Sequence, residues 1–598
     1  MNLPKTKENL LSWPGSLIIC VCIFVFFNFF RPIEIEDIWW HLKTGEWIVT
    51  HLQVPHHDLF PFGNEQAPWI FTQWLGSSFL YLVYKFCGLF GLKVFRALLF
   101  IGTILLFFKQ AIGKARLPVV MALVLLLIPA LYSRSNLRPD IFNYIFIQIF
   151  LIQLFRFQRS NNAKDLIPLP LWGILWSNIH LGSFVYGIPL IGAFLLSSMG
   201  QFNFNKSKAL ALVLFFYCAS FLVSPYGYEA LLYPFKVFLI PDYLHFYFSL
   251  NTIDEMTPLL KYPYWYLKFF WSIPLFFTVV ILLSKKENKA NRLLYALLSF
   301  LSLFMYLRGV RAAAFFAIVI SYVILESLSN IQGVKNAALN KFQKCFWLIV
   351  ISVLLLKSFY LYHRTDFKNG RQVKDISLDI EAVNPGAALA FMDRFGLQGK
   401  VFNGDIFGGL IIWSSYPRLR PFMDGRNNSR RFVEYHQILQ DPTKYWTKYE
   451  SRYDFKILLL DTKQEGSFSL ARCLNKKIWQ LVYFDDASII YARRDSFHFS
   501  REVLELETQL KNIPISPEDK KNIKVLLGRD NPKEGINPSF LYPKSIDLIN
   551  EGETLLKLGY REAGYRTLLG ALNKAPRQEI EGILRSYWIK IDNKEGVI

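Results

Sequence analysis

The sequence predicts a mainly α-helical membrane protein, with about 11 transmembrane helices and a long first outer loop, then a small α/β soluble domain and a C-terminal helical segment. Of its 598 residues, 53% are hydrophobic, 17% are aromatic and only 19% are charged. The mean hydropathy is +0.25. Such a composition is too apolar for a soluble globular chain of this size. Before residue 365, apolar runs recur at the length that crosses a hydrocarbon core about 30 Å thick.

The formal net charge is +21, and much of the Lys and Arg lies in short connectors between apolar runs. We therefore interpret these basic residues as determinants of membrane topology and not as a nucleic-acid-binding surface. The six cysteines form no CxxC pair and no zinc-like spacing. They are predicted to be inert core residues.

The apolar segments predicted to span are 14–31, 94–112, 118–133, 141–157, 166–178, 183–200, 207–224, 264–284, 291–307, 311–328 and 343–362. Segment 69–88 is also apolar enough to span. If it crossed, the basic connectors that follow would face outward, against the positive-inside rule. We therefore expect it to lie along the outer surface.

This topology leaves the N-terminus in the cytoplasm and the C-terminal part outside. It predicts a transmembrane domain at 1–363 with an outer loop at 32–93, an extracytoplasmic α/β domain at 364–496 and a helical tail at 497–598.

The first outer loop begins with acidic residues, among them Glu36 and Asp37, followed by Trp39 and Trp40. A carboxylate partly buried beside tryptophans can have a pKa suited to general base work on a hydroxyl group. The alternative is that the acids cap a helix while the tryptophans form an interfacial belt.

The run D-I-W-W-H-L-K-T-G-E-W-I from Asp37, with V-P-H-H-D-L-F-P-F from Val54 and Q-W-L from Gln73, resembles a family of uncharacterised bacterial polytopic membrane proteins. Its layout is similar to the GT-C superfamily of integral-membrane glycosyltransferases. The resemblance implies a polyprenyl-phosphate-linked sugar donor and a bacterial inner-membrane location. It also implies that Asp37 is the catalytic acidic residue, with Glu36 second. His41, in the same run, is a candidate for substrate binding.

In several GT-C branches a DxD or DE pair binds a metal ion. Here the corresponding residues are Glu36-Asp37-Ile38-Trp39, so no metal ligand is predicted. A divalent cation such as Mg²⁺ or Mn²⁺ stays open as a cofactor.

Further polar residues on the predicted outer face are candidates for substrate binding. They are Arg134, Arg138, Asn178, His180, Tyr226, Arg308 and Arg311. Arginines there suit a lipid phosphate, and the alternatives are snorkelling or pairing with the acidic loop. The alternative for His180 is hydrogen bonding within a hairpin, and that for Tyr226 is membrane anchoring.

In the soluble domain we expect helices at 384–395, 429–450 and 466–476, and strands at 400–403, 409–413, 420–423, 455–461, 481–484 and 487–492. This alternation predicts a mostly parallel sheet. Asp405, Asp424 and Arg426 would project beyond the carboxyl ends of its strands, where ligands bind. Alternatively, Asp424 and Arg426 form a salt bridge within their turn.

The tail from Gly552 to Pro576 resembles a tetratricopeptide (TPR) helix pair, which must pack on the α/β domain or on a partner.

The leading hypothesis is a glycosyltransferase in the lipid bilayer that transfers a polyprenyl-phosphate-linked sugar to a glycan, lipid or protein acceptor. One rival is a transporter or flippase of a lipid-linked intermediate, and the other is a noncatalytic scaffold.

Overall fold

The computed structural model describes residues 13–34, 37–62, 68–239, 258–261, 278, 289–330, 341–363, 365–368, 371–375, 379–380, 384–426, 429–512 and 544–572. The chain divides into two compact units. The first comprises Met1–Arg31, His41–Leu59 and Gln66–Tyr362. The second comprises Pro32–Trp40, Phe60–Glu65 and His363–Ile598. Two short segments of the loop predicted at 32–93 therefore belong to the same unit as the C-terminal part.

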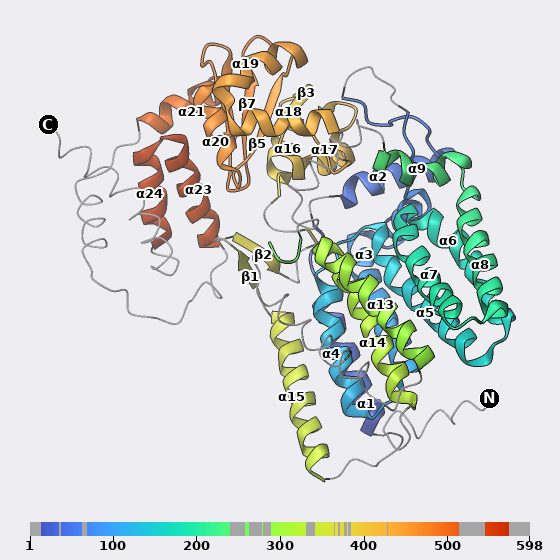
Figure 1. Cartoon of the computed structure of the whole chain (residues 1–598). Coiled ribbons are helices and arrows are strands. Elements are labelled where there is room, and N and C mark those ends of the chain that lie inside the picture. The colour runs from blue at the N-terminus through green and yellow to red at the C-terminus, as the bar shows by residue number, and fades with distance from the viewer. Residues whose placement is uncertain are drawn as a thin grey trace. The chain divides into compact units, whose positions relative to one another are not determined.

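The first unit is helical (Figure 1). Its elements are α1 (Trp13–Phe29), α2 (Ile38–His51, which begins in the second unit), α3 (Trp74–Ala111), α4 (Leu117–Tyr132), η1 (Pro139–Phe142), α5 (Asn143–Ser160), η2 (Ala163–Leu166), α6 (Pro168–Ile179), η3 (Leu181–Ser183), α7 (Phe184–Gly200), α8 (Phe204–Ala219), η4 (Ser220–Leu222), α9 (Tyr228–Leu239), α13 (Lys289–Arg308), η6 (Val310–Ala312), α14 (Ala313–Asn330) and α15 (Lys341–His363).

Each predicted span overlaps one of these helices, except 264–284, which lies outside the described residues apart from Thr278. Within the described part, three helices are long and apolar enough to cross a membrane: Trp74–Ala111, Pro139–Ser160 and Val310–Ser329. They support a membrane protein, whereas the number of about 11 spans stays a prediction.

Helix α3 is broken at Gly88, where φ is 63° and ψ is −162°. Glycine tolerates this conformation because it has no Cβ. The break lies at the end of segment 69–88, before the predicted span at 94–112.

The second unit is built around a small sheet. Its elements are β1 (Thr365–Lys368), β2 (Arg371–Asp375), α16 (Gly386–Arg394), β3 (Gly399–Asn403), η7 (Asp405–Phe407), α17 (Gly408–Ser415), β4 (Leu419–Pro421), α18 (Ser429–Gln440), α19 (Pro442–Tyr453), β5 (Ile457–Asp461), α20 (Glu465–Cys473), β6 (Trp479–Phe484), β7 (Ser488–Arg493), α21 (Arg501–Lys511), α23 (Lys544–Leu558) and α24 (Arg561–Leu572).

The main sheet has five strands in the order β4-β3-β5-β7-β6. Strand β3 is parallel to both β4 and β5, and Val401 lies opposite Pro421 and Ile457. Strand β7 is antiparallel to β5 and β6. The prediction of a mostly parallel sheet was therefore wrong. The connection from β6 to β7 is a tight turn in which Asp485 Oδ1 accepts hydrogen bonds from Ala487 and Ser488, and so short a connection only permits antiparallel strands.

The predicted strand at 409–413 is in fact helix α17, in which residues 408–412 are all buried. A short apolar run that is buried on every side does not distinguish a strand from a helix by its periodicity. The predicted helix at 429–450 is two helices. The second begins at Pro442, and the Asp441 side chain caps it by accepting from the Lys444 amide at 3.2 Å.

Phe62, from the loop predicted at 32–93, lies in the hydrophobic core of the second unit. Its ring centroid is 5.3 Å from that of Phe422 and 5.9 Å from that of Phe455. A short piece of the loop is therefore part of this domain's core.

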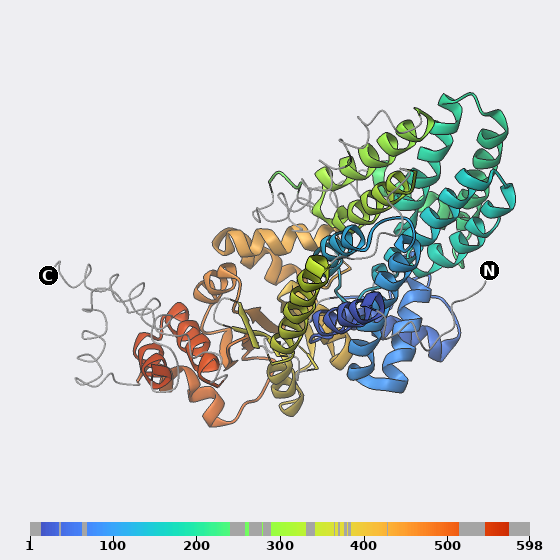
Figure 2. The same ribbon diagram turned by 90° about the horizontal axis from the view of Figure 1, so that it is seen from below.

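Helices α23 and α24 lie side by side in both views (Figure 1 and Figure 2). Their axes come close at Gly552, where an added Cβ would lie 3.1 Å from the carbonyl oxygen of Gly564. The pair packs on the α/β domain, since Leu555 and Tyr560 belong to the core that contains Phe62. Its likeness to a tetratricopeptide pair stays a prediction.

Candidate functional site

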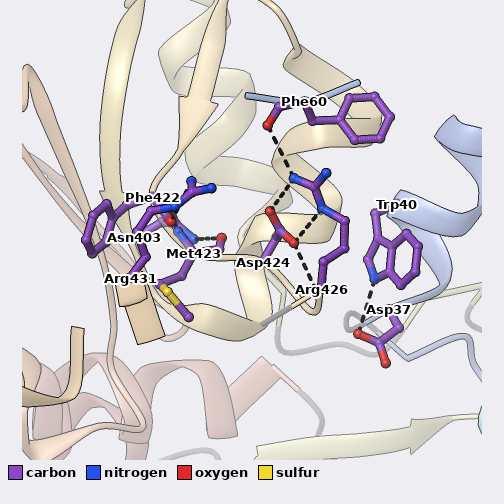
Figure 3. A network of polar contacts seen from close by, with 9 residues as sticks. All are labelled: Asp37, Trp40, Phe60, Asn403, Phe422, Met423, Asp424, Arg426 and Arg431. Carbon is purple, nitrogen blue, oxygen red and sulfur yellow. Dashed lines mark hydrogen bonds and ion pairs between the residues drawn. The ribbon is translucent and has the colours of Figure 1, made fainter. Parts of the chain in front are cut away.

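In the second unit, Asp37 lies against the turn that follows β4 (Figure 3). Asp37 directly precedes α2, and the Trp40 indole Nε1 donates to its Oδ1 at 3.3 Å. A Cβ added at Gly425 would overlap Asp37 Oδ1 and would lie 2.9 Å from Asp37 Cγ. The carboxylate therefore sits directly on the backbone of Gly425, and only glycine leaves room for it there.

The residues on either side of Gly425 form an ion pair (Figure 3). Arg426 Nε donates to Asp424 Oδ1 at 2.9 Å, and Arg426 Nη2 donates to Asp424 Oδ2 at 2.8 Å. Arg426 Nη2 also donates to the Phe60 carbonyl oxygen at 3.2 Å. Burial acts to raise the pKa of Asp424, but the Arg426 pair and Arg431 hold this pKa below its ordinary value. Asp424 and Arg426 thus form an ion pair within the turn, which is the alternative that the sequence left open for them.

Two features of the local sequence fix the position of this turn. The Asn403 side chain, at the end of β3, donates to the Met423 carbonyl oxygen at 2.9 Å and accepts from the Met423 amide at 3.3 Å. Gly408 lets α17 approach, because a Cβ there would lie 2.7 Å from Asp424 Cα. Because β3 and β4 are parallel, the segments that follow them lie at the same edge of the sheet.

Asp405 lies at the same end of β3 but has different partners. Its Oδ1 accepts from Gln464 Nε2 at 3.0 Å, and its amide donates to the Tyr435 hydroxyl at 3.3 Å. The hydrogen bonds of Asp405 therefore link it to Gln464, which follows β5, and to Tyr435 of α18, whereas those of Asp424 link it to Arg426.

In the first unit, a buried ion pair marks the start of α5. Arg134 Nη2 lies 3.0 Å from Asp140 Oδ2, and Arg311 Nη2 lies 3.8 Å from the same oxygen. Arg134 and Asp140 are 7% and 5% exposed, so this pair is held in the interior. Arg138 also acts electrostatically on Asp140. The structure thus gathers three of the predicted arginines around one carboxylate.

Two predicted histidines are buried in the same unit. His41 Nδ1 lies 2.7 Å from the Ser77 hydroxyl. Burial, and next Arg138, hold the pKa of His41 well below its ordinary value, while Asp140 opposes them. Burial is also the main reason that the pKa of His180 is lowered to about 4, with Arg311 and Arg134 adding to the effect and Asp140 opposing it. Both rings are therefore neutral at pH 7.

Helix α3 lies close to η1 and α6 at Gly76. A Cβ added at Gly76, near the start of α3, would lie 2.6 Å from Pro139 Cβ and 2.8 Å from the Ile179 carbonyl oxygen. The glycine therefore allows α3 to touch both the beginning of η1 and the end of α6. Leu181, just beyond His180, donates its amide to the Thr72 carbonyl oxygen at 2.8 Å.

Of the remaining predicted residues, Asn178 and Tyr226 form hydrogen bonds with backbone groups, and Arg308 lies at the end of a helix. Asn178 accepts from Trp74 Nε1 at 2.8 Å and donates to the Val223 carbonyl oxygen at 2.7 Å. It lines a cavity of about 600 Å³ with apolar walls. The Tyr226 hydroxyl donates to the Pro55 carbonyl oxygen at 2.7 Å and accepts from the Phe71 amide at 2.9 Å. Arg308 is exposed at the end of α13. Glu36 lies outside the described residues.

Sequence reasoning did not select several residues that complete these clusters. They are Ser77, Asp140, Asn143, Trp176, Asn403 and Gly425. Asp140 and Asn143 are polar residues at the edge of an apolar run, and this signal could have found them.

The described residues do not fit a divalent cation site. Among them, no three His, Cys, Asp or Glu side chains are grouped so that they could hold a metal ion. Near Asp37, the carboxylate of Asp424 is already paired with Arg426.

No family model matches the chain, and no curated protein matches it. Solved structures do match in fold. The archaeal oligosaccharyltransferase AglB from Archaeoglobus fulgidus, in complex with an inhibitory peptide and a dolichol-phosphate, aligns with a TM-score of 0.54 and 13% identity, covering 98% of this chain and 87% of that one. The oligosaccharyltransferase of the same organism tethered to an acceptor peptide containing the NVT sequon gives 0.55 and 13%, covering 93% and 87%. Its apo form gives 0.53 and 13%, covering 94% and 85%. The likeness shows that this chain shares the overall fold of that oligosaccharyltransferase over almost its whole length.

Proposed function

We propose that this protein is a membrane glycosyltransferase that transfers a sugar from a polyprenyl-phosphate-linked donor to an extracytoplasmic acceptor. The observation that carries the proposal is the likeness in fold, over almost the whole chain, to an enzyme whose solved complex holds a peptide and a dolichol-phosphate. Because fold does not determine function, the residues must supply the chemistry.

The arginine cluster of the first unit suits the phosphate of the donor. Arg134, Arg138 and Arg311 all act electrostatically on Asp140, so three guanidinium groups lie around one carboxylate. The polyprenyl phosphate that leaves carries about 1.5 to 2 negative charges at neutral pH, as other phosphate monoesters do. Arginine also offers paired donors that match phosphate oxygens. We assign these residues to holding the donor and stabilising the leaving phosphate.

Asp37 is our candidate for the general base, with Glu36 second. In the transfer step the acceptor oxygen forms a bond to the anomeric carbon, while the bond from that carbon to the phosphate oxygen breaks. The acceptor hydroxyl proton passes to the Asp37 carboxylate, and the phosphate leaves with the bonding electrons. The contacts with Trp40 and Gly425 support this role because they hold the carboxylate in one place.

We assign Asp405, Asp424 and Arg426 to the acceptor side of the reaction. Arg426 is engaged by Asp424 and by the Phe60 carbonyl, so its contribution is to keep the turn rigid. The peptide in the archaeal complexes supports a peptide acceptor in general, with a glycan or a lipid as the other classes. We place the protein in the bacterial inner membrane.

The test uses the purified full chain in lipid nanodiscs with a panel of polyprenyl-phosphate-linked sugars and candidate acceptors. Mass spectrometry then follows the release of polyprenyl phosphate. We expect turnover by the native chain, and loss of turnover with retained donor binding in Asp37→Asn. Donor that moves between leaflets without being consumed would favour a transporter, and a chain that binds no polyprenyl phosphate would favour a scaffold.

A further inference from the structure

Asn143 lies between an indole and an imidazole in the first unit. Trp176 Nε1, from α6, donates to Asn143 Oδ1 at 2.7 Å. Asn143 Nδ2 lies 3.5 Å from His180 Nδ1. The three side chains are 2% (Asn143), 0% (Trp176) and 8% (His180) exposed, so water does not compete freely for these groups.

This arrangement determines which nitrogen of His180 carries the hydrogen. An indole N–H can only donate, so the oxygen of the Asn143 amide must face Trp176. The NH₂ group of the amide must then face His180. Because two donors do not pair, His180 Nδ1 must be the acceptor and carry no hydrogen. In a neutral ring the hydrogen is therefore on Nε2.

The surroundings favour both the neutral ring and an anionic ligand. Burial lowers the pKa of His180 to about 4, so the ring is neutral at pH 7. The charged groups that act on it are Asp140, Arg311 and Arg134, which are those of the cluster assigned above to the donor phosphate. A neutral ring that carries its hydrogen on Nε2 can donate to a phosphate oxygen, and the nearby arginines favour an anionic ligand.

We propose that Trp176 and Asn143 are positioning residues that hold His180 as the Nε2–H tautomer, and that this hydrogen is donated to the phosphate oxygen of a polyprenyl phosphate. The second half rests on the proposed function, whereas the first half depends only on the three side chains.

The tautomer is tested by nitrogen NMR on the full chain labelled with ¹⁵N only in histidine, with the His180 signal identified by its loss in His180→Gln. Protonated and unprotonated ring nitrogens have widely separated shifts. We expect Nε2–H in the native chain, a mixture of tautomers in Trp176→Phe and Nδ1–H in Asn143→Asp. Trp176→Phe keeps a ring that stacks on Phe146 at 5.4 Å, so packing is preserved.

Trp172→Phe is the matched control. Trp172 lies one turn earlier on α6 and also contacts Phe146, at 6.2 Å between ring centroids. It should leave the His180 signal unchanged. A native chain with hydrogen on Nδ1, or a Trp172→Phe signal that changes as much as that of Trp176→Phe, would overturn the assignment of the tautomer.

The ligand is tested by titration with farnesyl phosphate, using farnesol as the uncharged control. We expect His180→Leu to weaken farnesyl phosphate binding about tenfold, which corresponds to the loss of one charge-assisted hydrogen bond. His180→Gln, which keeps an N–H donor, should stay within about threefold of the native chain. Equal affinities of His180→Leu and the native chain would overturn the donor role. If the native chain binds no farnesyl phosphate, the phosphate assignment fails together with the proposed function, while the NMR result still decides the tautomer.

Discussion

Substituting Gly425 by alanine should displace the Asp37 carboxylate while leaving the aspartate itself in the chain. The added Cβ would overlap Asp37 Oδ1 and lie 2.9 Å from Asp37 Cγ. Carbon atoms in ordinary contact are about 3.5 to 4.0 Å apart, so the carboxylate must retreat by roughly 1 Å. A catalytic group misplaced by about 1 Å can cost on the order of 100-fold in rate.

The assay is turnover of a polyprenyl-phosphate-linked sugar, with kcat and KM measured separately. We expect Gly425→Ala to lower kcat on the order of 100-fold. The KM for the donor should change little, because the residues assigned to the donor phosphate lie in the other unit. Thermal unfolding should shift by only a few degrees, since Asp37 is half-buried and can move.

Gly570→Ala is the control, because a Cβ there meets nothing within 4 Å. It should leave kcat unchanged. The double variant Asp37→Asn with Gly425→Ala should be no slower than Asp37→Asn alone, because both changes act through one carboxylate. An additive double variant, or a Gly425→Ala protein with native kcat, would refute the idea that this turn positions Asp37.

Three further predictions concern stability, each measured by thermal or denaturant unfolding in the same detergent. The pKa of His180 is lowered from about 6.5 in the unfolded chain to about 4 in the folded protein, so protonation of this ring favours unfolding. The free energy of unfolding should therefore fall by up to about 3 kcal/mol as pH drops from 6.5 to 4. It should fall less in His180→Gln. Phe62→Ala should cost about 3 to 5 kcal/mol because the ring is in the core of the second unit, whereas Leu52→Ala, at an 87% exposed position, should cost less than about 0.5. Asp424→Asn should cost roughly 3 kcal/mol, since it leaves the nearly buried Arg426 without its charge partner; a cost below about 1 kcal/mol would show that the pair is not needed.

Much of the secondary structure could be predicted because it follows from local pattern. Apolar runs of the right length became helices such as α4 and α14, and the predicted strand at 455–461 became β5. The errors came where local pattern permits two answers. Residues 409–412 are all buried, and for such a run only the packing decides between strand and helix.

The candidate site divides in the same way. Asp37 was selected from the sequence run that resembles a known family, Arg134 from its place at the edge of an apolar run, and Asp424 from its place after a strand, and their roles stay proposals. Their partners could not be predicted. Asn143 and Trp176 acquire a role only because they meet at the end of α6, and Gly425 only because Asp37 rests on it.

From its own composition and order, the sequence determines a mostly helical membrane protein with a smaller part that contains strands, since hydrophobic length and periodicity act over neighbouring residues. Tertiary structure alone decides that a segment near residue 37 joins a turn near residue 425, and that an amide selects a histidine tautomer. Contacts between residues far apart in the chain depend on how whole elements pack, and that information is not present in any local stretch of sequence.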